Sequence, residues 1–205
     1  MKTLLLIGGG GQCRAAIDVI EAEGQFRILG VVRPEAEGKD SVLNYPILGD
    51  DRDLPNLLRQ TSYAMITVGQ IKTSAPRRNL YELLKGLKAE LPVIISPQAY
   101  VSRHATIQEG TLVMHGAVIN AGAQLGRNGI VNSLALVEHD AVIGDHCHIS
   151  TGARINGGVI VEDGCFIGSG AVIREGLRIG ANSVIGAGCV VTRQIDTNTL
   201  VKANS

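Results

Sequence analysis

Aromatic residues are scarce in this sequence, and neither sign of charge is in excess. Its 205 residues include two Phe, four Tyr and no Trp, although 45% are hydrophobic. A core built from such a chain must be filled by small and branched aliphatic side chains. Lys plus Arg and Asp plus Glu both number 19, so the formal net charge is zero. Nucleic acids and anionic membranes attract basic surfaces, so this balance favours neither as a partner.

Long apolar segments and grouped cysteines are also missing. The apolar run in MKTLLLIGGGG is too short for a signal peptide, and no stretch approaches the roughly 20 apolar residues of a membrane span. We therefore expect a cytoplasmic protein without membrane insertion. The four cysteines show no zinc-like spacing, and disulfides are unexpected in that compartment.

A six-residue repeat dominates the second half of the chain. Every sixth residue from 95 to 191 is Ile, Val or Leu, without one insertion: Ile95, Val101, Ile107, Val113, Ile119, Leu125, Val131, Val137, Ile143, Ile149, Ile155, Val161, Ile167, Ile173, Ile179, Ile185 and Val191. The residue four positions after each of the first 16 anchors is small, except Val159 and Leu177. This alternation predicts short strands joined by tight corners. Three such strands form an 18-residue triangular coil, and the coils stack into a prism, a parallel β-helix.

Three cysteines fall in the small-residue register of this repeat: Cys147, Cys165 and Cys189. A metal or redox site is one interpretation of them. Their register favours the other, in which they are small core residues.

The first 92 residues lack this period and have an α/β pattern. Apolar segments predict strands and helical spacing predicts helices, in the order strand 4–7, glycines 8–11, helix 14–22, strand 28–32, strand 64–68 and helix 77–91. This order begins a doubly wound parallel sheet. Pro92 marks the boundary, so we expect domains at 1–92 and 93–205.

Four glycines between a strand and a helix favour a phosphate-bearing ligand over a plain tight turn. A dinucleotide cofactor fits poorly, because the third glycine of the G-x-G-x-x-G fingerprint falls on Cys13. The acidic residue that would hold the ribose is replaced by Arg33. An NAD-dependent oxidoreductase is therefore disfavoured.

All five histidines lie in the repeat half. We expect His104 and His115 to be solvated surface residues. His139 lies between Glu138 and Asp140, and a neighbouring carboxylate can orient an imidazole and hold its pKa where a general base works. A zinc site shared between subunits, as in β-helical carbonic anhydrases, is the metal-dependent alternative, but the spacing of His139, His146 and His148 does not match it.

The sequence resembles the bacterial sugar-nucleotide and sialic-acid acetyltransferases of the NeuD/PglD family over nearly its whole length. The resemblance is carried by LLLIGGGGQCR, YPILGDD, ITVGQ and, most specifically, residues 131–157, VNSLALVEHDAVIGDHCHISTGARING. It implies a Rossmann-like N-terminal domain that binds a nucleotide-activated sugar, a left-handed β-helix that binds acetyl-CoA, and a homotrimer.

The resemblance also implies roles for individual residues. His139 corresponds to the general base, Asp140 to the carboxylate that raises its basicity, and Asn132 to a residue that holds the acceptor group. The acetyl-CoA site corresponds to His148, Gly157, Ser169 and Ala187, without a metal. The sugar-nucleotide site corresponds to Gly11, Gln12, Cys13 and Gly69, with Arg33 nearby.

Some residues depart from the family pattern. Gln12 replaces the histidine that often follows the glycines, and Arg33 replaces an acidic residue, so the identity of the nucleotide and sugar is open. The chain ends at LVKANS, where relatives continue through a G-x-P-A segment, which suggests a shortened C-terminus or a coenzyme held differently. His139 and His148 are half a coil apart, so they face different sides of one prism. We therefore expect active sites shared between subunits.

The resemblance therefore implies an acetyl-CoA-dependent acetyltransferase that acts on an amine or hydroxyl of a nucleotide-linked sugar for surface glycans. Direct transfer is expected, because no cysteine or serine nucleophile stands in a matching motif. O-acetylation of a sialic-acid-type sugar is an alternative within this class. A zinc lyase and a non-catalytic trimeric scaffold are alternatives from other classes.

Overall fold

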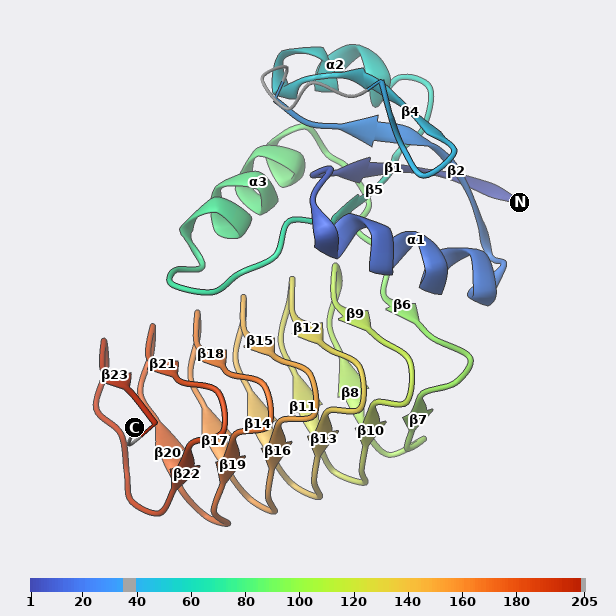
Figure 1. Ribbon diagram of the computed structural model, residues 1–205. Helices are drawn as coiled ribbons and strands as arrows, with labels where there is room; N and C mark the ends of the chain where they lie inside the picture. Colours follow the sequence, from blue (N-terminus) through green and yellow to red (C-terminus); the bar gives the residue numbers. More distant parts are fainter. Residues whose placement is uncertain (35–39, 204–205) are drawn as a thin grey trace.

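The computed structural model describes residues 1–34 and 40–203. Figure 1 shows an α/β domain lying on one side of a prism of stacked coils. The predicted architecture, an α/β domain followed by a left-handed parallel β-helix, is confirmed. No helix within the described ranges is long and apolar enough to cross a membrane.

The N-terminal domain is built on a five-stranded sheet with the order β3-β4-β2-β1-β5. Its strands are β1 (Lys2–Ile7), β2 (Phe26–Val32), β3 (Ser41–Val42), β4 (Tyr45–Gly49) and β5 (Tyr63–Ile66). All neighbours pair in parallel except β3 and β4. Its helices are α1 (Gly11–Glu23), the 3-10 helix η2 (Asp51–Asp53), α2 (Leu54–Leu57) and α3 (Ala75–Gly86). One apolar layer joins α1 to the sheet, and a second joins α2 and α3 to its other face.

Several predicted boundaries were wrong. Helix α1 begins at Gly11 and not at residue 14, because the glycines themselves enter the first turn. Helix α3 ends at Gly86 and not at residue 91. The chain then turns, and Glu90 forms a parallel bridge with Tyr63 of β5. The β3–β4 hairpin and helices η2 and α2 were not predicted.

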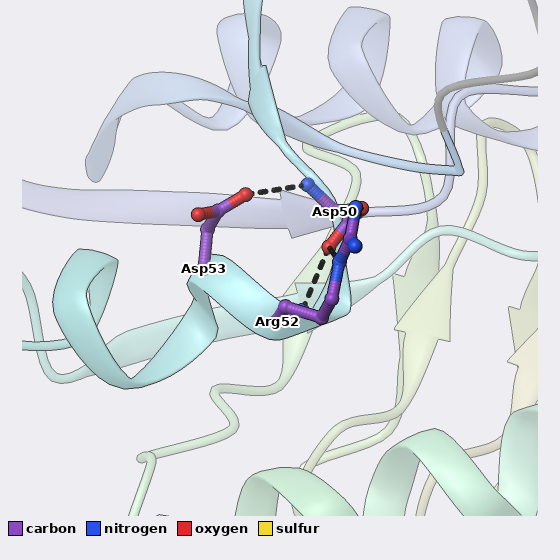
Figure 2. A network of polar contacts seen from close by, with 3 residues as sticks. All are labelled: Asp50, Arg52 and Asp53. Carbon is purple, nitrogen blue, oxygen red and sulfur yellow. Dashed lines mark hydrogen bonds and ion pairs between the residues drawn. The ribbon is translucent and has the colours of Figure 1, made fainter.

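A network of polar contacts orders the turn after β4 (Figure 2). The Asp50 carboxylate accepts a hydrogen bond from the backbone N–H of Arg52 at 2.9 Å, and Asp53 accepts one from the backbone N–H of Asp50 at 3.0 Å. These reciprocal bonds form a capping box at the start of η2. The Arg52 guanidinium also bonds Asp50 and lowers the pKa of that carboxyl to about 2.

The β-helix has three faces, each a parallel sheet of two-residue strands. Face 1 contains β6 (Ile94–Ile95), β9 (Leu112–Val113), β12 (Ile130–Val131), β15 (His148–Ile149), β18 (Phe166–Ile167), β21 (Val184–Ile185) and β23 (Leu200–Val201). Face 2 contains β7 (Tyr100–Val101), β10 (Val118–Ile119), β13 (Leu136–Val137), β16 (Arg154–Ile155), β19 (Val172–Ile173) and β22 (Val190–Val191). Face 3 contains β8 (Thr106–Ile107), β11 (Gln124–Leu125), β14 (Val142–Ile143), β17 (Ile160–Val161) and β20 (Arg178–Ile179).

Strand pairing in the prism confirms the 18-residue coil. Each two-residue strand from β6 to β19 pairs with the strand 18 residues further on, as Ile130 does with His148. The anchor residues point inward and form one apolar core with the small residues, including Cys147, Cys165 and Cys189. All four cysteines are free and buried, so the interpretation of these three as core residues is the one that fits.

The chain runs from face 1 to face 2 to face 3, so the prism has three rows of corners. Corner 1–2 is the row at 114–117, 132–135, 150–153, 168–171 and 186–189. Corner 2–3 is the row at 120–123, 138–141, 156–159 and 174–177. Corner 3–1 is the row at 126–129, 144–147, 162–165 and 180–183. Face 1 lies under the N-terminal domain, where α1 contacts β6.

Candidate active site

The candidate base lies at corner 2–3 on the surface of the prism. Asp140 accepts a hydrogen bond from Nδ1–H of His139 at 2.9 Å, which leaves Nε2 of the imidazole free to take a proton. This hydrogen bond raises the pKa of His139. Both side chains are exposed, at 66% and 73%. The geometry brings together the histidine and the carboxylate of the predicted general base.

The imidazole of His139 lies over Gly157 on the next coil. A Cβ atom placed on Gly157 would lie 2.6 Å from Nε2 and 2.7 Å from Cε1 of the ring. The carboxylate of Asp140 lies in the same way against Gly122 on the preceding coil. Gly157, predicted as a coenzyme contact, therefore leaves the space that the ring of the candidate base occupies.

Asn132 and His148 meet at the opposite edge of face 2. Asn132 starts a turn of corner 1–2, and its Nδ2 lies 3.3 Å from Nε2 of His148. The His148 ring is buried against Phe166 and the N-terminal domain, with Nδ1 3.0 Å from the backbone oxygen of Gln70. Burial and the charge of Arg77 lower the pKa of His148 to about 4, so the ring is neutral at pH 7.

The predicted catalytic residues are thus divided between two rows of corners. His139 and Asp140 lie on corner 2–3, whereas Asn132 lies on corner 1–2 beside His148. The predicted coenzyme residues are divided in the same way. Gly157 is on corner 2–3, and Ser169 and Ala187 are exposed on successive turns of corner 1–2. Face 2 separates the two groups within one chain.

The predicted sugar-nucleotide residues lie at the end of β1 and the start of α1. Gly11 is exposed, Gln12 is half-buried, and the Gln12 side chain lies beside Gly69, which follows β5. Nε2 of Gln12 is buried without a partner among the described residues. The Cys13 side chain, by contrast, is fully buried in the core, and its N–H bonds the carbonyl of Gly10.

Arg33 borders a cavity of about 280 Å³ at the carboxyl ends of the parallel strands. The cavity is also lined by Gly8, Val68, Asp51 and Asn79. Ligands of open α/β sheets bind at this edge. The methylene groups of Arg33 pack so closely on Gly9 that a Cβ placed on Gly9 would lie 2.5 Å from Cδ of Arg33.

The prediction for His115 was wrong in detail. This histidine joins the two domains, because its ring contacts Ser96 Oγ at 2.6 Å and Asp18 Oδ2 at 2.9 Å. Its place on the prism surface is covered by α1, which a repeat pattern alone does not reveal. His104 is exposed, as expected.

Sequence reasoning missed the polar side chains between the domains. Arg77 is fully buried and donates to the backbone oxygens of Ile66, Val68 and Asn128 and to Asn128 Oδ1. Gln70 is 3% exposed and donates to the carbonyls of Gly164 and Cys165. Most of their partners are backbone oxygens, and the contacts across the domains span 51 to 95 residues of sequence, so no motif marks them. Across the described residues, no three His, Cys, Asp or Glu side chains gather as a metal site.

Two profiles of known families match the chain. Residues 3–84 match the PglD N-terminal domain, and residues 158–193 match the bacterial transferase hexapeptide (six repeats). A search of curated protein sequences gives no match.

Solved structures resemble the whole chain. A variant of perosamine N-acetyltransferase from Caulobacter crescentus, in complex with CoA and GDP-perosamine, is 32% identical with a TM-score of 0.92, over 99% of this chain and 94% of that one. The acetyltransferase domain of PglB from Neisseria gonorrhoeae is 32% identical with a TM-score of 0.91, over 100% and 98%. WeeI from Acinetobacter baumannii shares the fold at 22% identity, with a TM-score of 0.82 over 100% and 98%.

Identity of 32% over almost the full length of both chains, with the same two-domain fold, is decisive for membership. The chain belongs to the PglD-like family of hexapeptide-repeat sugar acetyltransferases.

Proposed function

We propose that this protein transfers the acetyl group of acetyl-CoA to an amine of a nucleotide-linked sugar, with His139 as the general base. The hydrogen-bonded pair of His139 and Asp140 carries this proposal, because it leaves an accessible, basic Nε2 on the prism surface. The similar Caulobacter enzyme binds CoA and GDP-perosamine, which supports this substrate class. Transfer to a hydroxyl of a sialic-acid-type sugar is the alternative, since the same base serves either acceptor.

The proposed chemistry is direct transfer. Nε2 of His139 takes the proton of the acceptor as its nitrogen or oxygen forms a bond to the thioester carbonyl carbon, whose π electrons move onto the oxygen. A lone pair of that oxygen then re-forms the carbonyl as the C–S bond breaks, and His139 gives the proton to the departing thiolate. Asp140 stabilises the imidazolium that exists between these steps.

Acetyl-CoA fits the edges of face 2. The exposed residues Ser169 and Ala187 on corner 1–2 are small and uncharged, which suits a pantetheine chain, and His148 and Gly157 would lie near the acetyl end. Arg174 and Arg193 are exposed toward the C-terminal end of the prism, where cationic side chains suit the phosphates of the coenzyme. A cavity of about 600 Å³ there is lined by residues including Arg193 and Lys202.

The acceptor would bind the N-terminal domain. Gly11, Gln12 and Gly69 lie together at the loop above face 1, and the cavity beside Arg33 lies at the same end of the sheet. Cys13 would contribute only through its place in the first turn of α1. Asn132 would lie at corner 1–2 where the acceptor group meets the acetyl carbonyl.

The proposed assembly is a homotrimer in which face 2 lies toward the three-fold axis. The outward residues of this face are apolar except Arg154: Tyr100, Val118, Leu136, Val172 and Val190. A face turned toward the axis places corner 2–3 of one subunit beside corner 1–2 of the next. His139 of one chain would then face Asn132 and His148 of its neighbour. Four free cysteines and these substrates suit the cytoplasm.

The experiment that tests this function is acetyl-CoA turnover, followed by thiol release, with UDP-, GDP- and CMP-linked amino sugars and free sialic acids. We expect one acceptor class to be used, and His139→Ala to lower kcat by about 10³-fold while unfolding and CoA binding stay unchanged. Near-normal turnover by His139→Ala would refute the base. Failure of the wild type to bind acetyl-CoA would refute the enzyme and favour a scaffold.

A further inference from the structure

Gln70 reaches from the N-terminal domain to corner 3–1 of the prism, at the edge of face 1. It directly follows Gly69, and its Nε2 donates to the backbone oxygens of Gly164 at 3.1 Å and Cys165 at 3.2 Å. Two carbonyl oxygens require the NH₂ end of the amide to face them. This orientation holds even though Oε1 is left buried without a partner among the described residues. The backbone of Gln70 is therefore fixed over the prism.

That fixed backbone sets the tautomer of His148. A carbonyl oxygen only accepts, so the 3.0 Å contact with the Gln70 oxygen requires the hydrogen of His148 to be on Nδ1. Burial and the nearby Arg77 charge keep the ring neutral by lowering its pKa to about 4. Nε2 then carries a lone pair. In this tautomer Nε2 can accept a hydrogen bond but cannot donate one.

His148 in turn orients the amide of Asn132. Its Nε2 can only accept, so the group 3.3 Å away must be the NH₂ of Asn132. The other end of the amide agrees, because Asn132 Oδ1 accepts the backbone N–H of Ser133 at 2.8 Å. One N–H of Asn132 is used on His148, and the second remains for a ligand at corner 1–2.

We propose that Gln70 is a positioning residue for acetyl transfer, acting through His148 so that Asn132 presents an N–H, and not a carbonyl oxygen, to the reacting groups. This inference rests on the proposed function. An N–H complements the oxygen that becomes negative when the thioester carbonyl is attacked. It would hinder an amine whose lone pair must remain free. The N–H of Asn132 therefore donates to the negative oxygen of the tetrahedral adduct. Gln70 links the loop at Gly69 to this donor.

The tautomer can be measured without turnover. In protein carrying ¹⁵N-labelled histidine, long-range proton–nitrogen NMR distinguishes Nδ1–H from Nε2–H, and a His148→Gln variant identifies the signal. We expect Nδ1–H at pH 7 in the wild type. The variant Gln70→Met has similar length but no donor, and it should shift His148 toward Nε2–H. A wild-type His148 that is charged or carries its hydrogen on Nε2 at pH 7 would overturn the proposal.

Kinetics provide the second measurement. Gln70→Met should lower kcat by about 10-fold while KM for acetyl-CoA changes less than about twofold, because the lost interaction belongs to the transition state. Asn132→Asp keeps the shape but removes the N–H, and kcat should fall by about 10²-fold. The control Gln124→Met lies exposed on β11 and should change neither property.

The outcomes separate the two proposals. If Asn132→Asp were as active as the wild type or faster, the group it contacts would be a cation and the assignment of the N–H would be wrong. If no acceptor were acetylated but His148 showed Nδ1–H in the wild type and not in Gln70→Met, the positioning network would stand and the proposed function would fail.

Discussion

At the scale of single residues, the candidate base depends on a glycine one coil away. The His139 ring occupies the space that a side chain at residue 157 would need, and it can do so because hexapeptide corners repeat every 18 residues. The sequence motif identified His139 and Asp140 because they are adjacent. It gave no sign that Gly157 supports the ring, since this contact depends on the direction in which an exposed imidazole leaves its corner.

Gly157→Ala should therefore impair the reaction more than the fold. The backbone of Gly157 is not in the left-handed region, and the three atoms nearest to the new Cβ all belong to the His139 ring, which is exposed and can rotate away. We expect the free energy of unfolding to change by less than about 1 kcal/mol. Displacement of Nε2 by about 1 Å should lower kcat by about 10²-fold. Urea unfolding and steady-state kinetics measure the two effects.

Gly86→Ala is the matched control, because nothing lies within 4 Å of a Cβ at the end of α3. It should leave kcat unchanged. Equal kcat for wild type and Gly157→Ala would show that the ring has another working position.

At the scale of elements, the sequence predicted the strands of the prism far more accurately than the helices and strands of the N-terminal domain. Inward anchors recur every six residues, so the strands of the three faces follow from the pattern alone. The helix that α1 forms begins inside a run of glycines, which helix propensity does not favour, because packing on the sheet decides its start. The polar layer between the domains was unpredictable, since Gln70 bonds only backbone oxygens and Arg77 bonds backbone oxygens and one neutral amide, Asn128, which no charge pattern marks.

This buried layer should make the fold sensitive to acid. The pKa of His148 is lowered to about 4 in the folded chain, and that of His146 is lowered in the same direction by burial. Below about pH 6.5 the unfolded chain therefore binds more protons than the folded chain, so stability falls as pH decreases toward 4. For His148 alone we expect a loss of about 2 kcal/mol between pH 7 and pH 5.

Urea unfolding at pH 7 and pH 5 measures this loss. His148→Gln should reduce the difference between the two pH values by most of that amount, although it lowers stability at both. His104→Gln removes an exposed histidine and should retain the wild-type pH dependence. If His148→Gln retained it as well, His148 would not be a source of the acid sensitivity.

At the scale of the whole molecule, one chain carries the candidate site residues in two separate groups. His139 and Asp140 lie on corner 2–3, and Asn132 and His148 lie on corner 1–2, with face 2 between them. The nine-residue separation of the two histidines predicted that they face different sides. It did not predict that the face between them would be nearly all apolar, because the outward residues of the strands follow no strict rule.

The proposed trimer can be tested by mixing two inactive variants. His139→Ala lacks the base and Asn132→Ala lacks the amide, so a site built within one chain is defective in every subunit of a mixed assembly. A site shared between neighbours has one intact copy in each mixed trimer, where the His139 of one chain meets the Asn132 of the next. Random mixing of equal amounts should restore about one quarter of the wild-type activity.

Co-expression of the two chains with different affinity tags, followed by purification through both tags, isolates the mixed assemblies. Within these, about one third of the wild-type activity is expected, since one of three sites is intact. If the doubly purified assemblies had the mass of three chains but no activity, the trimer would stand and each site would lie within one subunit. Leu136→Glu introduces a charge on face 2, and we expect it to break the assembly and abolish activity, because both groups of site residues then lose their partners. A monomeric Leu136→Glu protein with full turnover would refute the proposal that each active site is shared between two subunits.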